Sequence, residues 1–182
     1  MVFAYDTEAT LAFTAALINT LPGASHSRDD ELTEPQALVT ILDDNEYSGR
    51  RDGDRVELDE VRAARHEFRR FWEVDRDEAV EIVNAFLRDA RALPQLVRHD
   101  SWDWHLHATE SDAPLVTRIR VEVAMAFVDV IRSGEYDRLR VCAADDCDAV
   151  LVDLTRNRSK RYCDVGNCGN RMNVVAYRAR RG

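Results

Sequence analysis

Apolar residues recur every three to four positions along most of the first 137 residues, a spacing that places them on one face of an α-helix. The pattern predicts helices over residues 8–21, 59–73, 77–92 and 114–132, and a less regular one over 34–43. The segment 114–132 is apolar around most of its circumference. We therefore expect it to form the central and most buried helix.

Two stretches of this region break the helical pattern. Residues 43–57 are rich in Asp, Glu, Arg and Gly, and they are predicted to form a solvated loop. Residues 101–108 alternate strictly between apolar and polar side chains, which predicts a β-strand.

The polar face of the predicted strand carries Asp103, His105 and His107. A His-x-His pair can bind a metal or serve as acid and base. No third ligand follows at a metal-site spacing, and His99 stands alone in the sequence. We therefore interpret this face as a solvated surface.

Charge divides the chain near residue 138. Residues 138–182 contain ten basic and five acidic residues, a net charge of +5, whereas residues 1–137 contain 15 basic and 29 acidic residues, a net charge of −14. We therefore predict an acidic helical domain over 1–137 and a basic domain over 138–182. No run of 18 apolar residues and no signal-peptide pattern occurs, so we expect a soluble, cytoplasmic protein without a membrane partner.

All four cysteines lie in the basic region, with the spacing C-x4-C-x15-C-x4-C: Cys142, Cys147, Cys163 and Cys168. Two pairs of equal spacing indicate a metal site, and disulfides, the alternative, are disfavoured in a reducing compartment. Thiolates at four tetrahedral corners favour Zn²⁺ over an iron–sulfur cluster. Such a centre has no open position for water, so we predict a structural zinc site and no enzyme.

The segments around the cysteines predict a small fold of their own. Residues 150–154 and 159–163 are expected to pair as a β-hairpin that turns at Asn157, and a helix is expected to begin at Cys168. This arrangement is that of a treble-clef-like zinc finger: a knuckle (the turn between Cys142 and Cys147), a hairpin, and a helix that carries the last ligand in its first turn. The expected fold is therefore mainly α, a helical N-terminal domain followed by this finger.

Basic residues exceed what a four-thiolate zinc centre needs for charge compensation. Residues 156–181 contain eight basic residues and a single acid, Asp164. A basic zinc module of this kind is typical of proteins whose Lys and Arg side chains contact the phosphates of nucleic acids. The predicted contacts are Arg156, Arg158, Lys160, Arg161, Arg171, Arg178 and Arg181.

Cys168-Gly169-Asn170-Arg171, preceded by Arg140-Val-Cys142, Val152-Asp153, Arg156-Asn-Arg158 and Arg161-Tyr-Cys163, resembles the CGNR-type zinc finger of bacterial, notably actinobacterial, proteins. The upstream helices, with Leu17-Ile18-Asn19-Thr20 near their start, resemble the domain that usually precedes that finger, described as a stress-induced transcription regulator. The resemblance spans essentially the whole chain. It implies a mainly helical body, a DNA-binding finger and zinc ligation by the four cysteines.

Details of the CGNR motif carry further expectations. Met172-Asn173 stand where family members commonly have Ala-Lys, so one phosphate contact of the family is missing here. Arg171 is interpreted either as a phosphate contact or as a brace to a backbone carbonyl. Gly169 is interpreted as permitting tight packing at the helix start, and Asn170 as capping or bracing the knuckle.

The leading hypothesis is a zinc-dependent DNA-binding transcriptional regulator in the stress response, whose finger contacts the phosphate backbone. Its partners would be DNA, a small-molecule or protein effector on the helical domain, and a second copy in a homodimer. The aromatic residues Phe68, Phe71, Trp72, Trp102 and Trp104 either line an effector pocket or pack in the core, and packing is favoured. The alternative is a zinc-stabilised module that binds protein or RNA and not DNA.

Overall fold

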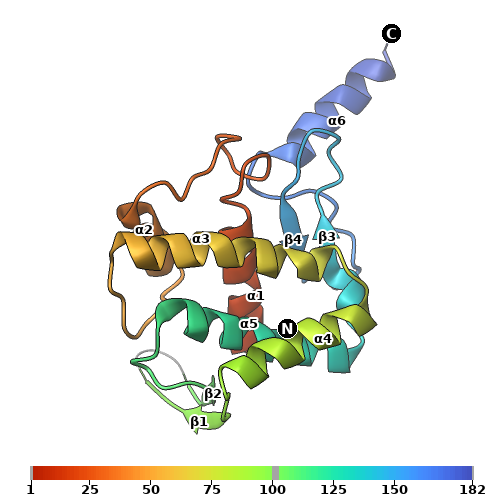
Figure 1. Ribbon diagram of the computed structural model, residues 1–182. Coiled ribbons are helices and arrows are strands. Elements are labelled where there is room, and N and C mark those ends of the chain that lie inside the picture. Colours follow the sequence, from red (N-terminus) through yellow and green to blue (C-terminus); the bar gives the residue numbers. More distant parts are fainter. Residues whose placement is uncertain (1, 100–102, 182) are drawn as a thin grey trace.

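Helix α5 (Leu115–Ser133) runs through the middle of the helical part of the molecule and packs against α1 (Tyr5–Ile18), α3 (Arg55–Arg69) and α4 (Arg76–Asp89) (Figure 1). Ten residues of α5 are buried, as expected from its apolar circumference. Helix α2 (Pro35–Asp44) packs against α3. The structure, a computed structural model, describes residues 2–99 and 103–181, and every helix expected from the periodicity is present in it.

Helix α3 begins earlier than its apolar pattern predicts, because a polar cap precedes the first buried apolar residue. The Asp54 carboxylate accepts a hydrogen bond from the backbone N–H of Glu57, and Glu57 accepts from the backbone of Asp52 and Gly53 at 3.0 and 2.8 Å. These bonds satisfy backbone donors at the start of the helix. The predicted loop over 43–57 is therefore shorter, and Glu57 within it is buried.

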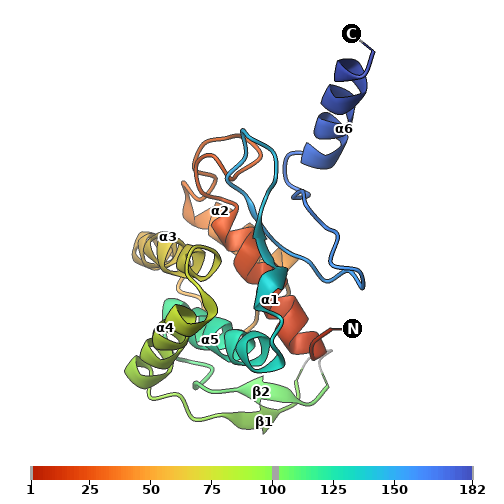
Figure 2. The same cartoon turned by 90° about the vertical axis from the view of Figure 1, so that its right-hand side faces the viewer.

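A β-hairpin lies at the end of the molecule opposite α6 (Figures 1 and 2). It pairs β1 (Gln95–Val97) antiparallel with β2 (His105–His107). Strand β2 confirms part of the strand predicted over 101–108, of which residues 101 and 102 lie outside the described residues. Trp104 is 58% exposed and does not join the core, because its backbone lies on a two-stranded hairpin at the surface.

The aromatic residues of α3 and the following 3-10 turn η1 (Arg70–Trp72) pack in the core, as favoured from the sequence. Phe68 and Phe71 are fully buried, and Phe71 stacks on Phe127 of α5 with ring centroids 3.9 Å apart. Trp72 is partly buried and meets the same Phe127 ring edge-on at 5.7 Å. Trp102 lies outside the described residues.

The C-terminal region, residues 138–181, contains a second hairpin and helix α6 (Cys168–Ala179), after the short 3-10 turn η2 (Tyr136–Arg138). Strand β3 (Leu139–Val141) pairs antiparallel with β4 (Val150–Val152), so the predicted pairing of 150–154 with 159–163 is wrong. The knuckle between Cys142 and Cys147 joins the two strands directly and so places β3 beside β4. Within the segment 159–163, the backbone oxygen of Arg161 instead accepts a hydrogen bond at 2.8 Å from the backbone N–H of Ala143 in the knuckle.

Strand β4 is joined to the helical body by side chains that bond to its backbone. The Asn19 amide, just after α1, donates to Val150 O at 2.9 Å and accepts from Val150 N at 2.8 Å. The indole of Trp72 donates to Leu151 O at 3.0 Å. These bonds explain Asn19 in the Leu17-Ile18-Asn19-Thr20 motif, since they connect the helical body to the finger.

Replacing Asn19 with Ala is expected to lower the free energy of unfolding by about 1–3 kcal/mol, because two buried backbone groups of β4 lose their partner. Chemical denaturation of the zinc-loaded chain measures this loss. Asn84→Ala, at an exposed position of α4, is the matched control and should change stability by less than about 0.5 kcal/mol. Equal effects of the two substitutions would contradict the role of Asn19.

None of the helices in the described residues combines the length and apolar composition that crossing a bilayer requires.

Candidate metal centre and nucleic-acid interface

The four cysteines converge at the junction of the knuckle, the following loop and α6. Cys142 and Cys147 flank the knuckle, Cys163 lies in the loop after β4, and Cys168 is the first residue of α6. All four are buried, and their sulfur atoms lie within 4.8 Å of one another. The Sγ atom of Cys163 is 3.7 Å from those of Cys147 and Cys168. Four thiolates about 2.3 Å from a tetrahedral zinc ion are about 3.8 Å apart, so this donor set fits Zn²⁺.

The surroundings of the cysteines affect their protonation differently. Burial raises the pKa of the Cys147 thiol to about 12. Burial also acts to raise the pKa of Cys168, but hydrogen bonds from Arg171 and the neighbouring cysteines outweigh it and hold that pKa below its ordinary value. Metal ligands must be thiolates, so zinc replaces the protons of these buried thiols when it binds.

Arg171 of the CGNR motif braces the metal centre. Its guanidinium donates to Cys168 Sγ at 3.2 Å and forms an ion pair with Asp146 in the knuckle. The hydrogen bonds that Arg171 donates to Asp146 and to Cys168 raise the pKa of Arg171 above its ordinary value. The hydrogen bonds of the Arg171 side chain thus go to a thiol and a carboxylate, and the alternative expectation of a brace to a backbone carbonyl is wrong.

Two other predicted phosphate contacts are paired with carboxylates. Arg158 lies 2.9 Å from Glu135 just after α5, and Lys160 lies 2.6 Å from Asp164. Both pairs are partly exposed to solvent, where an ion pair contributes roughly 0–1 kcal/mol. These cations are therefore held in place weakly and can exchange partners.

The remaining predicted contacts form no ion pair with any residue that the structure describes: Arg156, Arg161, Arg178 and Arg181. Arg181 lies over the ring of Tyr177 at 4.8 Å, and Arg161 over Tyr162 at 5.8 Å. All four side chains are exposed. Their charges are thus available to an anionic partner.

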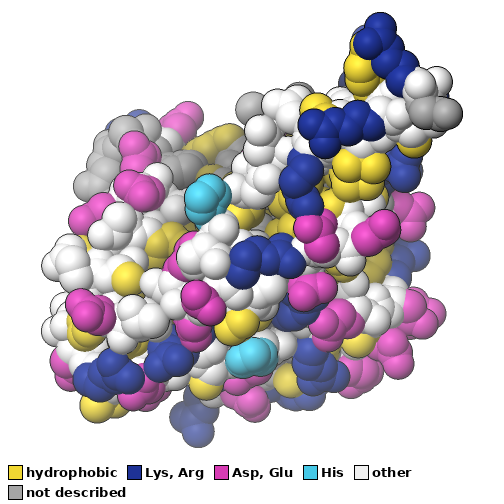
Figure 3. All heavy atoms as spheres, turned by 90° about the horizontal axis from the view of Figure 1, so that it is seen from above, with side chains coloured by type: hydrophobic (Ala, Val, Ile, Leu, Met, Phe, Trp, Pro, Cys, Tyr) yellow, Lys and Arg dark blue, Asp and Glu magenta, His cyan; other side chains and the backbone are white. Residues whose placement is uncertain are grey.

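Helix α6 projects from the rest of the molecule (Figures 1 and 2). Cys168 is its only buried residue, and Val174, Val175 and Tyr177 are about half exposed, at 48, 53 and 49%. Seen from above, dark blue Lys and Arg side chains gather with yellow hydrophobic ones near the C-terminal end (Figure 3). A shallow depression lies between the start of this helix and the preceding loop, and it is lined by residues 160–164, 167, 169 and 170.

The other two residues of the CGNR motif have local roles. A Cβ atom at Gly169 would lie 3.7 Å from the Tyr162 side chain, an ordinary contact, so tight packing does not require glycine there. The expectation for Gly169 is therefore wrong. The Asn170 amide donates to the Asn167 side chain at 2.8 Å, which braces the turn before α6.

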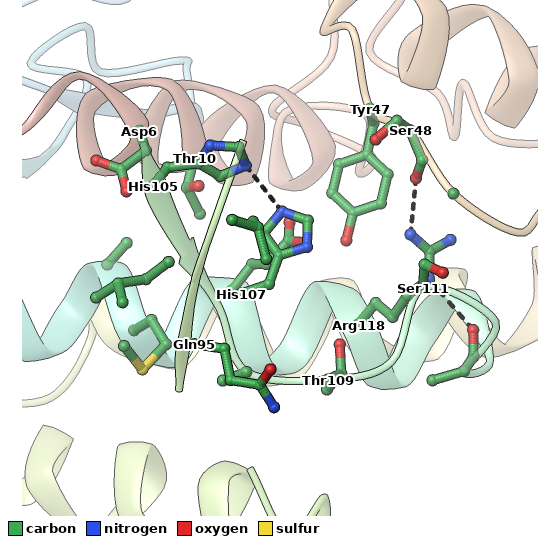
Figure 4. Close-up of a pocket in the computed structure, with 18 of the residues that line it drawn as sticks. Asp6, Thr10, Tyr47, Ser48, Gln95, His105, His107, Thr109, Ser111 and Arg118 are labelled. Atoms are coloured by element: carbon green, nitrogen blue, oxygen red, sulfur yellow. Dashed lines mark hydrogen bonds between the residues drawn. The ribbon is translucent and has the colours of Figure 1, made fainter. Parts of the chain in front are cut away.

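A cavity of about 960 Å³ lies in the helical body between α1, α5 and the β1–β2 hairpin (Figure 4). Tyr47, His107 and Arg118 are directed toward this space. Glu122 of α5 also lines it, and burial raises the pKa of this carboxyl to about 7.

The interpretation of the histidine-bearing strand face as a solvated surface is wrong, because this face lines the cavity. His105 is only 7% exposed, so the polar face of β2 is not a solvated surface. His99, which stands alone in the sequence, lies beside His105 and His107. The missed signal was a second short strand, Gln95–Val97, whose antiparallel pairing returns the chain to β2.

Comparison with family models identifies both parts of the chain. The CGNR zinc finger model matches residues 138–181, and the model described as "Putative stress-induced transcription regulator" matches residues 11–134. A search of curated proteins gives no match. The finger match and the four buried cysteines agree on zinc as the cofactor. The chain therefore belongs to the stress-induced transcription regulator family and carries a CGNR zinc finger after the regulator domain.

Proposed function

We propose that this protein regulates transcription by binding DNA in the cytoplasm, with α6 and the preceding loop contacting the phosphate backbone. The observation that carries the proposal is the set of exposed basic side chains without carboxylate partners among the described residues: Arg156, Arg161, Arg178 and Arg181. Cations placed in this way gain free energy by displacing counterions from DNA. The family supports a regulator, and the proposal adds the DNA contact.

The shape and charge of the molecule favour an approach through α6. The helical body carries a net charge of −14, which DNA would repel, whereas residues 138–182 carry +5. Because α6 projects away from the body (Figure 2), a duplex can contact it while the acidic helices stay at a distance. Zinc has an indirect role, because the centre holds the first residue of α6 against the knuckle.

Arg158, Lys160 and Arg171 complete the proposed contact set, with a difference in role. Lys160 can leave the exposed Asp164, and Arg158 the partly exposed Glu135, for a phosphate at small cost. Arg171 braces Cys168, so its substitution is expected to disturb the metal centre as well as binding. It is therefore a poor probe of phosphate contact.

In this proposal the helical body serves as the sensor or dimerisation unit and has no catalytic role. Its cavity would hold the effector, and a homodimer would give the finger a second DNA half-site, since no finger residue is assigned to base edges. The alternative function, a protein-binding module, is favoured by one observation, the half-exposed Val174, Val175 and Tyr177 on α6.

Salt dependence tests the phosphate contacts. Arg178→Ala in the zinc-loaded full-length protein is expected to weaken binding to unrelated duplexes by similar factors. It should also lower the slope of log K against log[salt] by about 0.9, the value for one phosphate contact. Fluorescence anisotropy with labelled duplex DNA at several salt concentrations measures both quantities.

The control is Arg55→Ala, which makes the same charge change on the acidic body, where Arg55 pairs with Asp59. It should leave the slope unchanged. An unchanged slope in Arg178→Ala would reject that residue as a phosphate contact. Absence of DNA binding by the wild type would reject the proposal and favour the protein- or RNA-binding alternative, with RNA as the parallel probe.

A further inference from the structure

Three histidine rings lie close together in the wall of the cavity in the helical body. Antiparallel pairing aligns Val97 with His105, and His99 follows Val97 by two residues. The Nε2 atom of His105 is 3.1 Å from that of His107 and 3.2 Å from that of His99, and the third pair, His99 and His107, is 3.3 Å apart. The three atoms thus form a nearly equilateral triangle.

Hydrogen bonds among the rings do not explain this triangle. A nitrogen of a neutral imidazole either carries a hydrogen and donates, or carries a lone pair and accepts. Among three nitrogens in mutual contact, at least two must therefore be of the same kind. At least one of the three contacts is then donor against donor or acceptor against acceptor, whatever the tautomers. A cation bound by three lone pairs removes this conflict.

The size of the triangle matches a metal site. Ligand nitrogens 2.0–2.1 Å from a tetrahedral zinc ion lie about 3.3–3.4 Å from one another. The observed separations of 3.1–3.3 Å are within a few tenths of an ångström of that value. The four-cysteine centre meets the same geometric test with sulfur ligands.

The orientation of His105 also suits a metal ligand. Its Nδ1 atom lies 2.7 Å from the backbone oxygen of Asp103. A carbonyl oxygen can only accept, so Nδ1 must carry the hydrogen. In the neutral ring this leaves the lone pair on Nε2, inside the triangle. A second ring nitrogen that donates to a backbone carbonyl is the usual arrangement of histidines that bind metals.

The geometry points to a second metal site, formed by His99, His105 and His107, for a divalent transition-metal ion of the zinc class. Imidazole ligands suit Zn²⁺ and its neighbours in the first row. Three protein ligands leave a fourth position for water or a ligand. Because the histidines line the cavity, that position is open to a small molecule with a donor group, such as a carboxylate.

A metal titration of the full-length protein tests the site. Protein with one equivalent of zinc in the four-cysteine centre is titrated with Co²⁺ and followed by visible absorption. We expect one further equivalent to bind, with a d–d spectrum but without the thiolate-to-cobalt charge-transfer band that the cysteine centre would produce. His105→Ala should weaken this second binding by more than the roughly 10–100-fold that loss of an outer hydrogen-bond partner costs.

His66→Ala, at an exposed position of α3, is the matched control and should bind both equivalents like the wild type. Proton NMR of the wild type adds a readout that needs no variant. Added Zn²⁺ should shift the ring resonances of His99, His105 and His107 and leave those of His26 and His66 in place. Unchanged resonances, no binding beyond the first equivalent, or undiminished second binding in a folded His105→Ala variant would overturn the site.

Discussion

Loss of one zinc ligand is expected to unfold the finger while leaving the helical body folded. In Cys163→Ser the tetrahedral thiolate set is broken, and the finger has few other buried residues to hold it. Zinc binding supplies on the order of 10–16 kcal/mol in zinc-finger peptides, far more than so small a core can replace. We expect the zinc of the four-cysteine centre to be lost and the amide resonances of residues 139–181 to collapse toward unfolded positions.

The Trp72 indole N–H reports on the coupling between the two parts. It donates to Leu151 O at 3.0 Å in the folded chain. Once β4 is lost, the NMR resonance of this indole proton should shift, and the proton should exchange faster with water. The control is Asp164→Ala, one residue beyond the ligand and 87% exposed at the side chain, which should retain zinc. Dispersed finger resonances in Cys163→Ser with a chelator present would contradict a zinc-dependent fold.

The local parts of the structure could be predicted from the sequence. Helical periodicity depends on residues three and four apart, so a single segment carries the whole signal, as in α5. The four cysteines gave the metal centre in the same way, through two equal spacings. Helix starts were less certain, because the start of α3 depends on Asp54 and Glu57, polar residues that lie outside the apolar pattern.

Which strands pair with each other could not be predicted. The sequence around 150–154 carries a strand signal, but its partner is chosen by the knuckle geometry, which selected 139–141. His99 joins His105 and His107 through β1, a strand of three residues with no alternating pattern of its own. Both cases depend on contacts that exist only once the chain has folded.

A second large effect is expected from removing a carboxylate that neutralises a buried cation. Arg65 of α3 is 1% exposed, and its guanidinium donates to both oxygens of Asp30 at 2.9 and 2.8 Å and to the Thr20 hydroxyl at 2.8 Å. In Asp30→Ala this charge stays buried without its partner. The expected loss is roughly 3–5 kcal/mol of unfolding free energy, a large share of the roughly 5–15 kcal/mol typical of a domain. Urea denaturation at neutral pH measures it.

The same pair predicts the acid response of the wild type. The hydrogen bond from Arg65 is the main cause that lowers the pKa of Asp30 to about 2, against about 3.9 in an unfolded chain. Because the folded pKa is the lower one, the contribution of Asp30 is complete above about pH 4 and is lost as the pH falls toward 2. Asp30→Asn should lack this part of the pH dependence.

A comparison of a surface ion pair with the buried one shows whether the loss of stability in Asp30→Ala arises from burial of the unpaired charge. Asp59 pairs with Arg55 and Arg62 where its side chain is 55% exposed, so Asp59→Ala should cost no more than about 1 kcal/mol. Replacing both partners, in Asp30→Ala with Arg65→Met, removes the unpaired charge and should recover part of the loss. If the double variant is as unstable as the sum of the two single ones, the penalty does not arise from an unpaired buried guanidinium, and the pair would be a packing element only.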